Sequence, residues 1–366
     1  MKARVEYIDV AKGISITLVV LYHSSLKLYF PELVQSTALF RMPLFFFLSG
    51  LFFSYAASPG VFFAKKAEAL LKPYFIVLFG LFFVELLVGD GPYAEELGGI
   101  FYGVGPTIKW TPLWFLTHLF CVYMCAYVVF RFCKLYLLNF VAQSLVLVAL
   151  ITLGSVYIDF FWQRPVAVYG LSAVLPGLPF SLDLVPVTLS YFIAGFLLRE
   201  RLPSFRPHAV MLVLCVLGYV SVRVFTDANM NLNFRKYVAP LYTTLGAVTG
   251  IYAVLSLSWL AERSRLLKAI PIKLGEASLF ILIFHYFIVQ KADAYLSRLA
   301  ENHAQLIFAA FIAFLLSLAI PLLIRAIVLK SALLSLAFFP VRSNKLWLRI
   351  HSIKSTETVP GVRKSD

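Results

Sequence analysis

The feature that most constrains this chain is a series of long apolar segments separated by short polar ones. Hydrophobic residues make up 61% of the 366 residues, more than a soluble domain of this size needs to bury. A membrane-spanning helix needs about 20 mostly apolar residues. Segments of this kind lie at residues 8–28, 39–57, 70–89, 112–131, 136–157, 182–198, 208–225, 237–260, 274–291 and 305–329. They predict an all-α, polytopic membrane protein with about ten transmembrane helices.

The backbone groups of a span must be satisfied inside the membrane, which helices achieve within one segment. The sequence lacks the short alternating segments that are typical of barrel strands, so helices are favoured. The first apolar segment is predicted to be retained rather than cleaved as a signal. Asp9, Lys12 and His23 lie within it, and no small-residue cleavage pattern follows.

The distribution of basic residues predicts the orientation. With the N terminus inside, the inner segments carry most of the Lys and Arg, around residues 65–72, 131–134, 199–206 and 263–273 and in the tail from residue 325. Because cytoplasmic loops collect these residues, both termini are predicted to be cytoplasmic. The net charge of +14 follows from this topology, which argues against a nucleic acid as partner.

The segments between the spans leave no room for an inserted soluble domain. Residues 5–330 are therefore predicted to form one transmembrane domain, and residues 331–366 a cytoplasmic tail. A basic amphipathic portion of the tail, residues 338–353, suits the anionic inner leaflet, and the last dozen residues are predicted to be disordered. The outer segments 90–111 and 158–181 are long enough to fold over an outer opening, and a third, 226–236, is polar and rich in Asn.

The four cysteines, Cys121, Cys125, Cys133 and Cys215, lie in spans or at their inner ends. Their spacing is not that of a disulfide framework. Cys121 and Cys125 are one helical turn apart, but no His or carboxylate nearby completes a metal site. We expect them to be packing residues, and we expect no metal.

Asp9, Lys12 and His23 form a polar stripe along the first predicted span. Lys12 and His23 are eleven residues apart, which is three helical turns plus about 20°, so both project from one face. Asp9 can pair with Lys12 near the inner surface, and His23 lies about 16 Å farther along the helix. Titratable residues within spans are costly and indicate a function by default.

His23 is the candidate catalytic residue. An imidazole is the side chain best suited to remove a proton from a hydroxyl at neutral pH. The alternative is a structural histidine bonded to a carbonyl of a neighbouring helix. His118 and His285 also lie within predicted spans, so axial ligation of haem iron is a further alternative.

Residues at the ends of other spans have two interpretations each. Arg41 either snorkels to the outer interface or binds substrate. Lys66 and Lys72 are either positive-inside residues or an anchor for a nucleotide phosphate. Trp114 is either an interfacial belt residue or part of a site. The pair at residues 49–50, Ser-Gly, predicts a bend or the close approach of another backbone.

Five phrases, in this order, resemble the acyltransferase-3 family of bacterial integral-membrane O-acyltransferases, especially its fucose 4-O-acetylase-like branch. Lys12 and His23 reproduce a basic residue, ten residues and a histidine. MPLFFFLSG stands at residues 42–50, Pro-Tyr at 73–74, PLWFL at 112–116 and LGEASL, ending in His285, at 274–285. The resemblance covers roughly residues 5–330 and implies ten core spans.

Two positions depart from the family pattern. Many relatives have His where this chain has Arg41, which bears on the choice of acceptor. The usual R-x-x-R pair is represented by Lys66 alone, with Ala69 in the second place. Lys65 or Lys72 would then supply the second contact to acyl-CoA.

The resemblance implies transfer of an acyl group, usually acetyl, from cytosolic acetyl-CoA to a hydroxyl of a cell-surface or exported carbohydrate such as an exopolysaccharide. His23 would act as general base or relay the acyl group. Lys12, Lys66 and Lys72 would bind the CoA phosphates. Four residues would lie on the acceptor side: Arg41, Trp114, His118 and His285. The implied location is the bacterial plasma (inner) membrane, and the partners are acyl-CoA, a carbohydrate or lipid-linked glycan, and membrane lipids.

Other functions remain open at the level of the residues. A secondary transporter of a sugar, glycan precursor or anion would also need buried charges and kinked helices. A structural subunit would have no need of three histidines in the apolar layer. The sequence identifies neither the acceptor nor the acyl chain, and it is compatible with a homo-oligomer.

Overall fold

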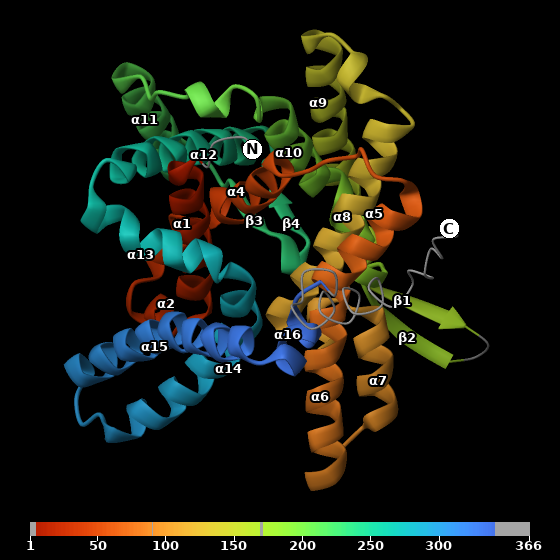
Figure 1. Ribbon diagram of the computed structural model, residues 1–366, viewed down its shortest axis with the longest axis vertical. Coiled ribbons are helices and arrows are strands. Elements are labelled where there is room, and N and C mark those ends of the chain that lie inside the picture. Colours follow the sequence, from red (N-terminus) through yellow and green to blue (C-terminus); the bar gives the residue numbers. More distant parts are fainter. Residues whose placement is uncertain (1–4, 90, 169–170, 341–366) are drawn as a thin grey trace, which may run out of the picture.

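The computed structural model describes residues 5–89, 91–168 and 171–340, and its ribbon is almost entirely helical (Figure 1). The helices are α1 Glu6–His23, α2 Leu26–Tyr29, α3 Pro31–Gln35, α4 Ala38–Leu51, α5 Pro59–Lys66, α6 Lys72–Val88, α7 Tyr93–Tyr102, α8 Trp114–Arg131, α9 Phe140–Tyr157, α10 Val185–Leu198, α11 Ala209–Phe225, α12 Pro240–Glu262, α13 Arg265–Glu276, α14 Ser278–Leu296, α15 His303–Lys330 and α16 Ala332–Phe338. The strands are β1 Trp162–Val168, β2 Leu171–Pro176, β3 Asn229–Asn231 and β4 Lys236–Val238.

Among the described residues, eight helices are long and apolar enough to cross a membrane. They include Pro31–Leu51, where α3 and α4 run on, and Pro59–Val88, where a π-helical turn at Ala67–Leu71 joins α5 to α6. The two other predicted spans also contain helices, α1 and α11. The prediction of an all-α polytopic membrane protein is therefore confirmed.

The first span differs from its prediction at one end. Residues 8–28 were expected to form one helix, but α1 ends at His23. Ser24 is extended, with ψ 158°, and its hydroxyl donates to the carbonyl of Leu21 at 2.8 Å. His23 therefore lies at the end of the helix, where the chain turns, and not in its middle.

Close backbone contact joins α4 to α10. A Cβ added at Gly50 would lie 2.0 Å from the carbonyl oxygen of Phe192, and one at Gly195 would lie 2.0 Å from that of Phe47. The two glycines thus make reciprocal contacts, as small residues do between membrane helices. This confirms the close approach predicted at residues 49–50.

Helix α1 lies at the centre of the helical packing, against α4, α12, α13 and α14. The sequence analysis did not predict α13, an amphipathic helix packed along α1. A Cβ at Gly13 would lie 1.9 Å from the carbonyl oxygen of Pro271. The ammonium of Lys268 also bonds to the carboxylate of Glu6. These contacts fix the rotation of α1 and hence the direction in which its polar stripe points.

Two short hairpins lie outside the spans. Strands β1 and β2 pair antiparallel and project to one side (Figure 1), and β3 pairs with β4 with Met230 opposite Tyr237. Arg235 follows β3 in the left-handed region, with φ 53°, and its side chain forms a buried ion pair with Asp183. The second hairpin is thereby fastened to the 3-10 segment Pro179–Leu184 that precedes α10.

The predicted tail begins with α16. Phe338 packs on Phe280 of α14, with ring centroids 5.4 Å apart. Residues 341–366 lie outside the described residues, and so does most of the amphipathic portion predicted at 338–353.

Candidate active site

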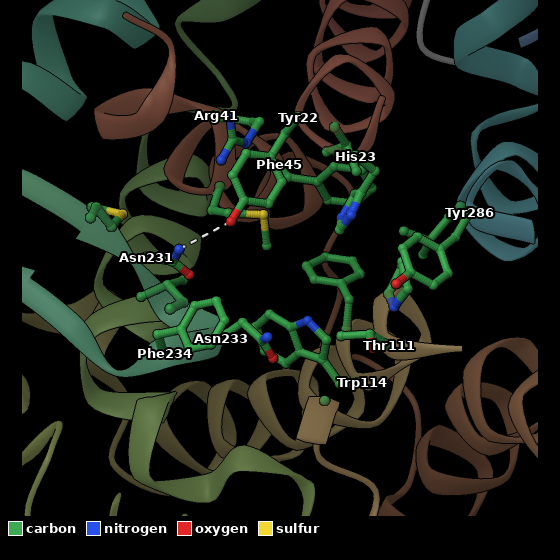
Figure 2. A pocket seen from close by; sticks show the side chains of 18 of the residues that line it. Tyr22, His23, Arg41, Phe45, Thr111, Trp114, Asn231, Asn233, Phe234 and Tyr286 are labelled. Carbon is green, nitrogen blue, oxygen red and sulfur yellow. Dashed lines mark hydrogen bonds between the residues drawn. The ribbon is translucent and has the colours of Figure 1, made fainter. Parts of the chain in front are cut away.

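A cavity of about 380 Å³ opens beside the end of α1, and we call it the outer cavity, after the side predicted to face away from the cytosol. Its side chains come from α1, α4, α14, the segment before α8 and the β3–β4 hairpin (Figure 2). The lining residues are Val19, Tyr22, His23, Lys27, Arg41, Met42, Phe45, Gly105, Pro106, Thr111, Pro112, Trp114, Phe115, Met230, Asn231, Leu232, Asn233, Phe234, Leu282 and Tyr286. Aromatic faces and amide or hydroxyl groups therefore surround one space, which is the kind of surface that a sugar can stack and hydrogen-bond against.

His23 lies on the wall of this cavity among other rings. Its ring centroid is 5.2 Å from that of His285, 5.0 Å from that of Tyr22 and 5.4 Å from that of Tyr286. Tyr22 and Tyr286 meet it edge-on. The structure thus brings together two histidines that are far apart in the sequence.

His285 lies behind His23 and is fully buried on α14. Its Nδ1 is 2.7 Å from the carbonyl oxygen of Ile281, and since a carbonyl only accepts, Nδ1 carries the proton. Nε2 is then an acceptor in the neutral ring. Among the described residues Nε2 has no hydrogen-bond partner, so the contact between His285 and His23 is one between rings and not a hydrogen bond.

His118, which the resemblance implied to be an acceptor contact, does not line the cavity. It is fully buried, and its Nε2 is 3.0 Å from the hydroxyl of Thr188. Its ring lies against Trp114, with centroids 5.6 Å apart and planes 34° apart. Trp114 does line the cavity, so His118 supports a cavity residue from behind.

Arg41 points into the protein instead of snorkelling outward. Its side chain is buried, its Nη1 donates to the hydroxyl of Thr37 at 3.2 Å, and its guanidinium lies 4.1 Å from the centroid of the Tyr22 ring. Figure 2 shows it beside Tyr22 at the edge of the cavity. Of the two interpretations of this residue, the geometry favours substrate binding.

A smaller inner cavity, of about 170 Å³, lies farther toward the N-terminal end of α1. It is lined by Lys12, Ser15, Phe45, Leu48, Ser49, Phe52, Tyr123 and Ser278. The ammonium of Lys12 is 3.0 Å from Asp9 and 3.8 Å from the centroid of the Phe52 ring. The hydroxyl of Ser15 is buried and has no hydrogen-bond partner among the described residues, which is typical of a surface that receives a polar ligand.

Lys66 and Lys72, the two lysines predicted near the inner surface, lie in different surroundings in the structure. Lys66 lies with its ammonium 3.5 Å from the ring centroid of Tyr123, a residue of the inner cavity. Lys72 lies beyond the π-helical turn and donates instead to the carbonyl of Phe339 at 2.6 Å. The structure therefore places Lys66 against Tyr123, a ring that lines the inner cavity as Lys12 does, and places Lys72 against the C-terminal segment.

Phe45 is common to the linings of both cavities. Its ring meets Phe115 edge-on, with centroids 4.7 Å apart. The polar stripe of α1 thus runs from Lys12 at the inner cavity to His23 at the outer one, with Phe45 between them.

Several lining residues were missed by the sequence reasoning. Tyr22 and Tyr286 are direct neighbours of the two histidines, but no motif or spacing in the sequence identified them as site residues. Asn231 donates through Nδ2 to the hydroxyl of Tyr22 at 3.1 Å (Figure 2). The Asn-rich composition of 226–236 was the available signal, and only the fold shows that this segment covers the site.

The geometry does not favour the haem alternative. The rings of His23 and His285 are in contact and tilted by 56°, so no macrocycle fits between them. Nε2 of His118, the atom that would ligate iron, is hydrogen-bonded to the hydroxyl of Thr188 instead.

These features define a multi-pass helical membrane protein with a histidine on the wall of an outer cavity and a second, inner cavity beside the same helix. The family model for the acyltransferase domain of the acyltransferase-3 family matches residues 5–326, and the chain belongs to this family. It is a membrane acyltransferase, which decides against the transporter alternative. No curated protein and no solved structure matches the chain significantly, and the fucose 4-O-acetylase-like branch stays a prediction.

Proposed function

We propose that this protein moves an acyl group, acetyl in the simplest case, from acyl-CoA on the cytosolic side to a hydroxyl of a cell-surface or exported carbohydrate. The protein would be located in the bacterial plasma membrane, as the family resemblance implies. The observation that carries the proposal is the arrangement along α1: an inner cavity lined by Lys12, an imidazole at His23 on the outer cavity, and Phe45 common to both cavities.

The inner cavity suits the donor. Lys12 and Lys66 supply positive charge for the CoA phosphates, which favour cationic, charge-assisted contacts. The unpartnered hydroxyl of Ser15 offers a hydrogen bond to the polar arm that carries the thioester. Since Phe45 separates this cavity from His23, the acyl end of the arm would pass this ring to react.

The outer cavity suits the acceptor. His23 would take the proton of the acceptor hydroxyl while that oxygen forms a bond to the acyl carbonyl carbon. The bond from this carbon to sulfur then breaks, and the thiolate of CoA takes up the proton. His285, whose ring contacts that of His23, would hold the His23 ring in position.

The function is tested by comparing O-acyl groups on surface carbohydrate from cells that carry the wild-type gene, no gene, or the His23→Ala gene. Removal of a general base lowers a rate by about 10²–10⁴-fold, so His23→Ala should match the strain without the gene. His208→Ala is the control, because His208 is exposed and lies outside both cavities. Equal amounts of His23→Ala and wild-type protein with equal acylation would refute the assignment.

A second measurement separates the base from the acyl relay. Purified protein mixed with labelled acetyl-CoA and no acceptor, then quenched, retains label on His23 only if an acyl-imidazole forms. Absence of bound label together with full transfer to the glycan supports general-base catalysis.

A further inference from the structure

A third cavity, of about 400 Å³, adjoins the outer cavity, and we call it the side chamber. The two share six residues: Tyr22, Lys27, Arg41, Met230, Asn231 and Phe234. A ligand bound in the outer cavity can therefore extend into the side chamber.

The described residues that line the side chamber include three cations and no carboxylate. Lys27 comes from α2, Arg41 from α4 and Lys236 from β4. Asp293 of α14, which interacts electrostatically with Lys27, lies outside the lining and accepts a hydrogen bond from Ser25 at 2.6 Å. Three cations from three elements thus face one space.

Arg41 is the most informative of the three because it is buried. Only 6% of its surface is exposed, yet within the described residues no carboxylate lies within ion-pair distance of it. Of its five N–H donors, one bonds Thr37. A buried charge without a counter-ion is costly, and buried charges are normally paired.

The other deeply buried arginine gives the contrast. Arg235 is 2% exposed and is fully paired, with Nε 2.8 Å and Nη2 3.3 Å from the two carboxylate oxygens of Asp183. The fold thus supplies a counter-ion to Arg235 but leaves Arg41 facing a cavity. An anionic ligand bound in the side chamber would act as the counter-ion of Arg41.

We infer that the side chamber binds an anionic group of the acceptor, a carboxylate or a phosphate, while a neighbouring hydroxyl of the same molecule reaches His23. The substrate class is then an acidic glycan. This inference rests on the proposed function, since it takes the outer cavity as the acceptor site. Arg41 and Lys27 line the outer cavity together with His23, so one ligand can meet all three side chains.

The amides and rings around the opening fit the same ligand. Asn231 lines both cavities and is held by Tyr22. An amide can bond sugar hydroxyls, and the Arg41 guanidinium is suited to bidentate contact with a planar carboxylate or a phosphate.

The test uses surface polysaccharide from cells that carry the gene, stripped of O-acyl groups with mild base. The deacylated polysaccharide is prepared in three forms, namely native, carboxyl-reduced and dephosphorylated. Each form is assayed with labelled acetyl-CoA. The readout is the ratio of kcat/KM for the native form to that for each neutralised form. We expect a ratio of about ten or more for wild type, as for loss of a charge-assisted hydrogen bond. Whichever neutralised form loses activity identifies the source of the anion.

The variants are Arg41→Gln and the exposed pair Lys27→Gln with Lys236→Gln, which remains informative if Arg41→Gln fails to fold. Each should bring the ratio toward one, whereas a purely structural defect would lower activity on all forms alike. Lys291→Gln is the matched control, since Lys291 is exposed and lines none of these cavities. Its ratio should equal that of wild type.

The test separates failure of the acidic-glycan inference from failure of the proposed acyltransferase function. A polysaccharide that carries no acidic group, or equal kcat/KM on native and neutralised forms, overturns the inference and leaves the acyltransferase function intact. No transfer to any form, with protein that is folded and binds acetyl-CoA, overturns both.

Discussion

Arg235 and Asp183 form an ion pair with both side chains fully buried, the Nε of Arg235 lying 2.8 Å from Oδ2 of Asp183. Arg235 also donates to the hydroxyl of Ser181 at 3.2 Å. Its guanidinium lies 4.9 Å from the ring centroid of Trp162 in β1. The pair therefore ties the β3–β4 hairpin, which lines the outer cavity, to the segment before α10.

We expect Asp183→Asn to loosen this hairpin. Loss of one partner leaves a buried charge uncompensated, which costs about 3–5 kcal/mol. Limited proteolysis in detergent should show faster cleavage between residues 226 and 238, and the KM for the acceptor should rise. Asp227→Asn is the control, since it lies in the same outer segment outside the pair. Unchanged proteolysis of Asp183→Asn would show that the hairpin is held by other contacts.

His285→Leu should lower kcat without a matching change in the KM for acetyl-CoA. The substitution fills the buried site with an apolar side chain but removes the imidazole ring that contacts His23. A loss of about tenfold or more is expected if His285 positions the catalytic base. The steady-state rate with saturating glycan measures it. A kcat equal to that of wild type would show that His285 has only a packing role.

Phe45→Ala should join the inner and outer cavities, because this ring lines both. Water would then reach the thioester, and hydrolysis of acetyl-CoA in the absence of glycan should rise several-fold. Release of free thiol measures this reaction. Phe79→Ala removes a comparable ring that stacks on Phe75 of α6, away from the site, and should leave hydrolysis at the wild-type level. If both variants behave alike, Phe45 does not separate the cavities.

Lys12→Met and Lys66→Met should raise the KM for acetyl-CoA, whereas Lys72→Met should change it less. Lys12 lines the inner cavity, Lys66 lies against the lining ring of Tyr123, and Lys72 bonds the carbonyl of Phe339. Each lost charge-assisted contact corresponds to about tenfold or more in KM. The same measurement with 3′-dephospho-CoA thioester shows which lysine meets that phosphate. A larger effect at Lys72 than at the other two would contradict this arrangement.

Gly195→Ala should destabilise the contact between α4 and α10. Its new Cβ would lie 2.0 Å from the carbonyl oxygen of Phe47, and a backbone atom cannot move aside cheaply. Overpacking of this kind costs about 1–3 kcal/mol, measurable as a lower midpoint for thermal loss of monodisperse protein in detergent. Gly80→Ala is the control, since nothing lies within 4 Å of its added Cβ. Equal midpoints for the two variants would mean that the helices separate without penalty.

The sequence alone was sufficient for the spans, because a segment must be apolar along its whole length to cross a bilayer. Each predicted range contains a helix. The same residues indicated the stripe from Lys12 to His23, since positions along one helix follow from its regular rise and rotation. The family phrases, which the family match confirms, were likewise local in sequence.

Only the tertiary structure decided how the helices face one another. In a membrane, the side of a helix that meets lipid and the side that meets protein are both apolar, so hydropathy does not reveal its rotation. For this reason the sequence did not show that His285 lies against His23, that Arg41 turns inward and is buried, or that His118 stands behind Trp114. Those relationships depend on contacts such as Gly13 with Pro271, which set the rotation of α1 and so determine where the stripe meets its cavities.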